Sequence, residues 1–330
     1  MSWENIQANL MLLPSPFTIF VVDMRIKQKY RSVLAGLLIA ISLQSCFTGI
    51  ENTGRISEKD VAKVKADVKS KEEVYLDSVK QEGFLSWKEG KRFYVADNNV
   101  RLILTPSVDS LRGAILKYAG YATRRQIDNS EEVVLRFVRE NREFRYDTGK
   151  TKEELSLTPP EYLVPFLVDL DFVESVGRKL VGLKLFLKTS QWKRADGSAE
   201  IGLRYMPVTI LSVGPGDAVY PFYVSFECGE RKSGVFMSSQ TSSVKNMTFG
   251  KLFSFTDIRE EYKSISDVNW ELITHGKVAP GMTKSECSLS LGAPLSVGRT
   301  PTHGGLYERW QYMNGVYLIF ENGLLINYRQ

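Results

Sequence analysis

The stretch Thr283-Lys284-Ser285-Glu286, followed closely by Leu291-Gly292-Ala293-Pro294, decides the fold of the C-terminal part of this chain. A threonine three residues before a glutamate can form a capping box. The hydroxyl accepts a hydrogen bond from an amide of the first helical turn, and the carboxylate reaches back to the threonine amide. Gly292 suits the left-handed end of a helix, and Pro294 prevents continuation. The stretch therefore predicts a helix that starts after Thr283 and ends at Leu291.

Signals on both sides of this helix predict the neighbouring elements. Upstream, Ser266 can cap a shorter helix that Gly276 ends. Downstream, the Asn-Gly pairs at 314–315 and 322–323 suit the positive φ values of two-residue type I′ turns, so they separate the strands of a meander. The three strands are predicted at residues 306–313, 316–320 and 324–329.

The resulting αα-βββ unit, residues 261–330, would bury Trp310 and Tyr312, or their alternate neighbours, between its sheet and its two helices. In order and spacing its motifs resemble the SmpA/OmlA (BamE-like) lipoprotein domain. The residues that carry the resemblance are Gly281, Met282, Thr283, Glu286, Gly292, Pro294, Trp310, Tyr312, Phe320, Asn322 and Gly323.

This resemblance implies a small αα-βββ fold found in outer-membrane lipoproteins, whose namesake is a non-enzymatic accessory of the β-barrel assembly machinery. It therefore implies a scaffold or binding role, with envelope or outer-membrane proteins as partners. The namesake is little more than this domain, whereas this chain of 330 residues carries a long region before it. The resemblance therefore supports the fold of residues 261–330 more strongly than it supports a shared function.

Residues 84–260 have a sequence pattern typical of short strands, in which β-branched and aromatic runs are interrupted by Gly, Pro, Asn and Asp. Residues 151–160 are polar and end in two prolines, so they predict a linker between β-rich domains at 84–158 and 159–260. The six residues from Gly90 and the six from Gly182 share a glycine, a basic residue and alternating apolar side chains, a pattern that would suit two SH3-like barrels. Strands are predicted at 91–95, 100–104, 114–118, 133–138, 183–187, 206–213 and 220–226. The predicted fold class is α+β.

Residues 46–83 are interpreted as a tether followed by an amphipathic helix. Between Ser57 and Gln81, apolar side chains recur at spacings that line one helical face, and charged residues occupy the others. Two interpretations remain open: a partner-binding or spacer helix near a membrane, and a helix that packs on its own domain.

Residues 24–46 resemble the export signal of a bacterial (Bacteroidota-type) lipoprotein. Four basic side chains between residues 25 and 31 precede an apolar run at 33–43. The run is too short for a transmembrane helix, which needs about 20 apolar residues. A lipobox-like sequence then ends the signal with Leu43, Gln44, Ser45 and Cys46.

The lipobox resemblance implies that Cys46 is diacylated and becomes the first residue of the mature chain. Residues 1–45 would then be an upstream extension, to residue 23, plus the signal peptide. Phe47 replaces the aspartate that retains lipoproteins in an inner membrane. We therefore expect an outer-membrane location, facing the periplasm, with the lipid bilayer as a partner.

Asp169 and Asp171 alternate with apolar residues in Leu167-Val168-Asp169-Leu170-Asp171-Phe172, so they predict a strand from which both carboxylates project on one face. A solvated strand edge is the favoured interpretation. The alternative is the carboxylate pair of a glycosidase, which requires a separation of about 5–9.5 Å around a sugar cleft.

Thiol chemistry and metal binding find little support in the sequence. Cys228 and Cys287 remain after Cys46 is assigned to lipid, and they can pair or stay reduced. His275 lies at a predicted helix end and His303 in a loop, outside any hydrolase or zinc motif. A Cys/His cell-wall hydrolase would have to assemble its site entirely by tertiary contact. We therefore predict no catalytic residue, metal or cofactor.

Charge and composition agree with a globular envelope protein. The chain has 43 Lys and Arg against 38 Asp and Glu, a balance that does not call for nucleic acid as a partner. The predicted function is a non-catalytic outer-membrane lipoprotein, a scaffold or binding component in envelope assembly or maintenance. The alternatives are a peptidoglycan- or glycan-binding protein acting through SH3-like barrels and, behind it, the Cys/His hydrolase.

Overall fold

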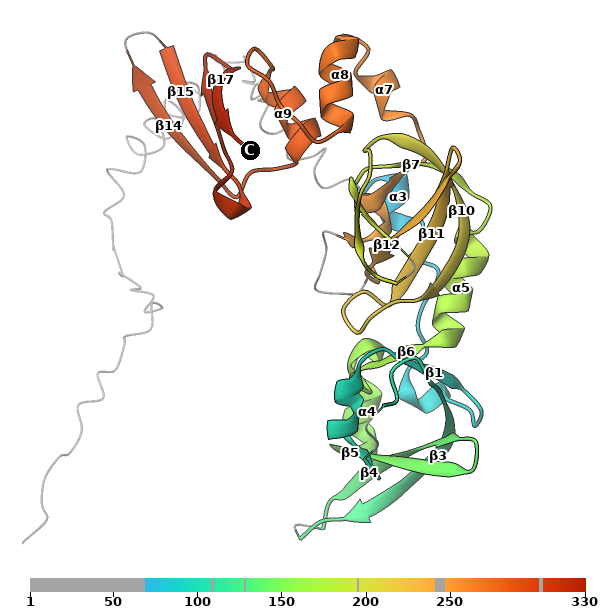
Figure 1. Ribbon diagram of the computed structural model, residues 1–330. Coiled ribbons are helices and arrows are strands. Elements are labelled where there is room, and N and C mark those ends of the chain that lie inside the picture. Colours follow the sequence, from blue (N-terminus) through green and yellow to red (C-terminus); the bar gives the residue numbers. More distant parts are fainter. Residues whose placement is uncertain (1–68, 108–109, 128, 195, 241–246, 303–304) are drawn as a thin grey trace, which may run out of the picture. The chain divides into compact units, whose positions relative to one another are not determined.

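The computed structural model describes residues 69–107, 110–127, 129–194, 196–240, 247–302 and 305–330. Along this part of the chain three antiparallel sheets, of six, seven and four strands, follow one another (Figure 1). Three separate hydrophobic cores accompany them. The helices are short, so the protein is β-rich, which fits the predicted α+β class.

The first sheet has the strand order β2-β5-β4-β3-β1-β6. Alternate side chains of its central strand, Val133, Leu135 and Phe137, are buried in the first core. Helix α4 (Lys152–Leu157) packs on β4 and β5 and adds Leu155 to that core. The strands are β1 (Arg92–Val95), β2 (Leu104–Thr105), β3 (Ile115–Arg125), β4 (Glu131–Arg139), β5 (Arg142–Thr151) and β6 (Leu167–Asp169).

Two predictions in this region are wrong. Residues 151–160 contain helix α4, because Thr151 and Glu154 form a capping box that the sequence analysis overlooked. Residues 100–104 belong mostly to a 3-10 helix, η3 (Asn98–Leu102), in which the Asp97 side chain accepts a hydrogen bond from the Asn99 amide. In addition, β6 pairs with β1, so the first sheet extends beyond the boundary predicted at residue 158.

The second sheet, in the order β13-β7-β10-β11-β12-β8-β9, curls strongly (Figure 1). Helix α5 (Leu170–Leu180) follows β6 directly and packs on β10, burying Val173, Val176 and Leu180. The strands predicted at 183–187, 206–213 and 220–226 are confirmed as β7, β10 and β11, with shifted ends. The strands are β7 (Lys184–Leu187), β8 (Gln191–Lys193), β9 (Ala199–Ile201), β10 (Met206–Pro215), β11 (Phe222–Cys228), β12 (Arg231–Met237) and β13 (Phe253–Ser254).

The described part of the predicted amphipathic helix is helical only in α3 (Lys71–Val74). A capping box between Ser70 and Glu73 starts this turn, and it packs on helix α6 (Phe249–Leu252). Tyr75 stacks on Phe249 at 5.3 Å between ring centroids. The prediction of a helix to Gln81 is therefore wrong, and residues 57–68 lie outside the described part of the chain.

The C-terminal domain contains the two predicted helices, α8 (Asp267–Thr274) and α9 (Lys284–Leu291), preceded by the short α7 (Ile258–Glu261). Its sheet has four strands in the order β14-β15-β16-β17, whereas three were predicted. The additional strand was missed because it contains glycine and proline and is exposed from Ser296 to Pro301, so no hydrophobic alternation marks it. The strands are β14 (Ser296–Thr302), β15 (Gly305–Gln311), β16 (Tyr317–Glu321) and β17 (Leu324–Arg329).

Candidate functional site

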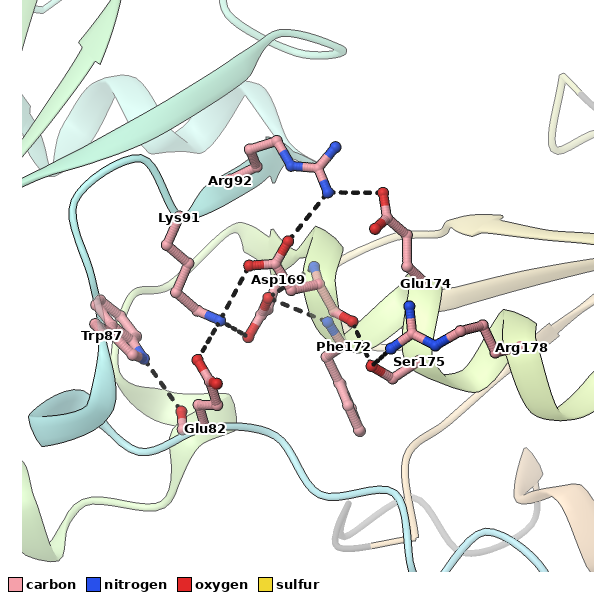
Figure 2. A network of polar contacts seen from close by, with 10 residues as sticks. Glu82, Trp87, Lys91, Arg92, Asp169, Phe172, Glu174, Ser175 and Arg178 are labelled. Atoms are coloured by element: carbon pink, nitrogen blue, oxygen red, sulfur yellow. Dashed lines mark hydrogen bonds and ion pairs between the residues drawn. The ribbon is translucent and has the colours of Figure 1, made fainter.

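A buried ion pair between Lys91 and Asp169 lies where the first sheet meets α5 (Figure 2). The ammonium and a carboxylate oxygen are 3.0 Å apart, and the two side chains are only 3% and 1% exposed. Lys91 directly precedes β1, and Asp169 ends β6, the strand that pairs with β1. The pair therefore fixes the register of two strands that are far apart in the sequence.

Asp169 is also the N-cap of α5. Its second carboxylate oxygen accepts hydrogen bonds from the amides of Asp171 and Phe172, at 3.0 and 3.2 Å. The prediction of a solvated strand edge is therefore wrong, because the strand ends at Asp169 and Asp171 lies in the first helical turn. With one oxygen on the helix and the other on Lys91, Asp169 stabilises a junction and is not arranged for acid–base chemistry.

Burial shifts the pKa values of Lys91 and Asp169 in opposite directions. Burial raises the pKa of the Asp169 carboxyl, and the attraction of Lys91 offsets only part of this effect. Burial would lower the pKa of Lys91, but the carboxylates of Asp169 and Glu82 outweigh it, so the pKa is raised. The lysine thus stays charged at neutral pH, and its charge favours the ionised form of Asp169 against the effect of burial.

Further carboxylates surround this pair. Glu82 lies 3.1 Å from the Lys91 ammonium, while Arg92 bonds to Asp171 at 3.1 Å and to Glu174 at 2.7 Å. The Trp87 indole donates to the backbone carbonyl of Glu82, so the segment before β1 is held in the same network (Figure 2). These outer pairs are half-exposed, and we assign them little stability.

A cavity of about 230 Å³ adjoins the network, and Trp87, Phe93, Phe172 and Asp169 contribute to its wall. A second cavity, of about 380 Å³, shares Phe172 with it and is lined mainly by apolar side chains such as Leu76. The outer wall of the second cavity is formed by the segment that follows α3. No sequence pattern marked these hollows, because their walls come from distant segments.

The C-terminal domain brings the predicted motif residues together. Thr283 and Glu286 form the capping box. The Glu286 carboxylate also accepts a hydrogen bond from the side-chain amide of Asn269 at 2.7 Å. Burial would raise the pKa of Glu286, but the hydrogen bonds from Thr283 and Asn269 lower it overall. Gly292 ends the helix with φ of +83°, as expected, and its carbonyl accepts from the Tyr312 hydroxyl.

The other motif residues are structural as well. Met282 is buried, and the ring centroids of Trp310 and Phe320 are 4.7 Å apart in the same core. The two Asn-Gly turns use the expected positive φ values at Asn314, Asn322 and Gly323. Gly281 also has a positive φ, and Pro294 follows the end of α9. These residues therefore account for the fold of the domain and do not identify a ligand.

The second face of the C-terminal sheet is open to solvent. Glu308, Leu318 and Phe320 are buried toward the helices, so their neighbours in β15 and β16 lie on the opposite face. The Arg309 guanidinium lies over the Tyr317 ring, 5.1 Å from its centroid. The residues of this face, which we call the open face, include Tyr307, Arg309, Tyr317, Ile319, Leu324 and Ile326.

A loop from the second sheet inserts between α8 and α9. Tyr205 has a φ of +60°, which is strained for a bulky residue at a cost of about 1–3 kcal/mol. Its hydroxyl donates to the Leu289 carbonyl at 2.8 Å, and its ring lies 5.5 Å from that of Trp270. Arg204 adds a backbone bond to Thr274, so the C-terminal helices are bonded to this loop. No local sequence pattern predicts this contact.

The two described cysteines are free thiols and are not arranged for catalysis. Burial raises the pKa of Cys228, and burial together with Glu286 raises that of Cys287 to about 12. A nucleophilic cysteine requires the opposite shift. His275 ends α8, with its Nδ1 2.8 Å from the Glu271 carbonyl, as expected for a helix terminus.

Several predicted residues lie outside the described part of the chain, namely Leu43, Gln44, Ser45, Cys46 and His303. Among the described residues, no helix has the length and hydropathy needed to span a bilayer. The same residues hold no group of three His, Cys, Asp or Glu side chains suited to a metal ion. Comparisons with models of protein families, with curated proteins and with solved structures give no match.

Proposed function

We propose that this protein is a lipid-anchored, non-catalytic component of a bacterial outer membrane that acts as a scaffold or binding protein in envelope assembly or maintenance. In this proposal Cys46 carries the acyl chains and the chain faces the periplasm. Residues 261–330 are a BamE-like domain that binds envelope proteins. The observation that carries the binding role is the open face of the C-terminal sheet.

The open face has the composition of a protein contact surface. Tyrosine and arginine are enriched among the residues that dominate binding energy, and Tyr307, Arg309 and Tyr317 lie on adjacent strands. The contact between Arg309 and Tyr317 orders both side chains before a partner arrives. Leu324 and Ile326 are 48% and 42% exposed, so a partner would remove apolar area from water.

The packing of α3 supports a tethered arrangement. Tyr75 contacts both Phe249 and Phe255, and Glu72 accepts a hydrogen bond from the Phe255 amide at 3.1 Å. A Cβ on Gly250 would lie within 3.0 Å of the Glu73 backbone, so the two segments touch closely. The first described segment of the chain is therefore fixed to the second sheet.

Crosslinking in intact envelopes, followed by purification of the protein, tests the binding role. We expect outer-membrane proteins to be recovered with the wild type and lost with the double variant Tyr307→Ala/Tyr317→Ala. Tyr162→Ala, which removes a tyrosine that is 57% exposed elsewhere, is the matched control. Equal recovery with all three proteins would refute the role of the open face.

Other outcomes would favour the alternatives. Co-sedimentation with the sacculus, without recovery of proteins, would favour glycan binding by SH3-like middle modules. Turnover of cell-wall material lost on Cys228→Ser or Cys287→Ser would favour the hydrolase, against which the raised thiol pKa values count.

Metabolic labelling with a fatty-acid probe tests the anchor separately. We expect label and membrane association in the wild type and loss of both on Cys46→Ser. An unlabelled wild type that fractionates in the soluble phase would contradict the anchor while leaving the open face to be judged by crosslinking.

A further inference from the structure

A groove runs along the first turns of α9, on the side of the C-terminal domain away from the open face. It consists of two adjoining cavities, of about 330 and 310 Å³, and both are within the size range of small-molecule sites, about 300–1,000 Å³. Tyr262 and Ser285 line both cavities. The first is completed by Tyr205, Lys284, Ser288, Leu289 and Trp310.

The groove combines aromatic rings with hydroxyl groups. Tyr205, Tyr262 and Trp310 come from three different segments and line one cavity. Ser285 and Ser288 are exposed and lie one helical turn apart on α9. Neither hydroxyl has a hydrogen-bond partner among the described residues. The positive φ of Tyr205 holds one of the rings in place, and strained backbone of this kind clusters at ligand sites.

Charge and hydrogen bonding exclude other ligand classes. Lys284, the cation that lines the first cavity, is already paired with Glu308 at 2.8 Å, and Arg299, outside the lining, lies 3.5 Å from the same carboxylate. A proline-rich peptide also docks in an aromatic-lined groove, where donors for its carbonyls would have to come from the side chains that line the groove. Here the Tyr205 hydroxyl already donates to Leu289, and the Trp310 indole donates to Glu308. The groups that remain are the aromatic faces, the Tyr262 hydroxyl and the hydroxyls of Ser285 and Ser288, which both donate and accept.

We propose that this groove binds a glycan, with the C–H faces of the sugar rings stacked on Tyr205, Tyr262 and Trp310. Sugar hydroxyls pair with Ser285 and Ser288, whose positions on a helix fix the spacing of the contacts. The site differs from the open face, and only Tyr205, in the loop before β10, comes from the second sheet. A protein partner and a glycan can therefore be bound by the same domain at once.

Isothermal titration of the full-length protein tests this site. The probe is a tetramer of β-1,4-linked N-acetylglucosamine, and the detergent has no sugar headgroup. We expect saturable binding that Tyr262→Ala weakens about tenfold through loss of a stacking ring. Ser285→Ala/Ser288→Ala should weaken it by a similar factor. These serines are exposed, so the double variant keeps the test valid if Tyr262→Ala does not fold.

Matched controls are Tyr162→Ala and Ser156→Ala, which remove an exposed tyrosine and an exposed serine elsewhere and should leave binding unchanged. Absence of binding up to about 10 mM sugar overturns the proposal. So does binding that both groove variants leave intact. Binding of decaproline, lost on Tyr262→Ala and without any binding of the sugar, assigns the groove to a peptide and overturns the glycan.

Discussion

Two lysine–carboxylate pairs connect distant segments of this protein, and they differ in burial. Lys91 and Asp169, 3.0 Å apart, are both almost completely buried. Lys284 and Glu308, 2.8 Å apart, are 37% and 5% exposed, so only the carboxylate is removed from water. If its partner is lost, a buried charge has no solvent to replace it, whereas a half-exposed lysine can turn outward. Similar distances therefore correspond to different energies.

The two ion pairs also connect different structural elements. Lys91 and Asp169 join β1 to β6 and, through the helix cap, to α5, which packs on the second sheet. Lys284 and Glu308 join α9 to β15 within the C-terminal domain. The Lys91–Asp169 pair therefore stabilises the junction between two sheets. The Lys284–Glu308 pair stabilises contacts within one small domain. The predictions below separate these roles.

The largest effect is expected for Lys91→Met. The substitution keeps the apolar stem and removes the ammonium, so Asp169 remains buried and unpaired. We expect the free energy of unfolding, measured in urea at pH 7, to fall by about 3–5 kcal/mol. Lys232→Met, at an exposed position on β12, is the matched control and should change it by less than about 0.5 kcal/mol.

A double variant distinguishes the cost of an unpaired buried charge at Asp169 from the cost of altered packing at position 91. Lys91→Met/Asp169→Asn removes both charges and keeps a good N-cap, because asparagine caps helices about as well as aspartate. It should recover most of the stability that Lys91→Met loses. If the double variant is no more stable than the single one, the uncompensated charge is not the cause.

The pH dependence of the Lys91→Met effect should be bell-shaped. Lys91 has a raised pKa in the fold, so its contribution is fully present below about pH 10.5 and is lost as the pH rises through the folded value. Asp169 also has a raised pKa, so acidification protonates it in the variant and removes the unpaired charge. The difference in unfolding free energy between wild type and variant should therefore peak near neutral pH. A flat profile from pH 4 to pH 11 would contradict this origin.

The C-terminal domain was the most predictable part because its signals are local. Thr283 and Glu286 are three residues apart and complete their capping box without help from the rest of the chain. The same holds for the turn at Asn322 and Gly323. Thr151 and Glu154 carry an equal signal, which was overlooked because two prolines follow it. Its detection would have replaced the predicted linker with a helix.

Other features depend on contacts that the sequence does not encode locally. Asp169 alternates with apolar residues as in a strand, although Val173, Val176 and Leu180 follow it at helical spacing. That spacing would have predicted α5. The partner of Asp169 could not be found in this way, because Lys91 is brought to it only by the pairing of β1 with β6. The strained Tyr205 is likewise visible only in three dimensions.

A smaller effect is expected for Glu308→Gln. The amide keeps an acceptor for the Trp310 indole but loses the charge that Lys284 faces. We expect a loss of about 2 kcal/mol in the free energy of unfolding at pH 7. The hydrogen bond from Lys284 lowers the pKa of Glu308, so this contribution is present above pH 4.5 and is lost as the pH falls below it. The variant and wild type should therefore converge in acid, whereas Lys284→Met should lose less at pH 7, because Arg299 remains 3.5 Å from the carboxylate.

The smallest effect is expected for Thr283→Ala, which removes one helix cap in the same domain. The amide of Glu286 loses its acceptor, and we expect a loss of about 1 kcal/mol in urea unfolding. Glu286 retains the hydrogen bond from Asn269, so its carboxylate is not left unpaired. Thr151→Ala makes the equivalent change at α4 and should have a slightly smaller effect, because the Thr283 hydroxyl also donates to the Glu286 carboxylate at 2.8 Å. A loss at Thr283 as large as that at Lys91 would show that the C-terminal domain also depends on one critical contact, rather than on many small local ones.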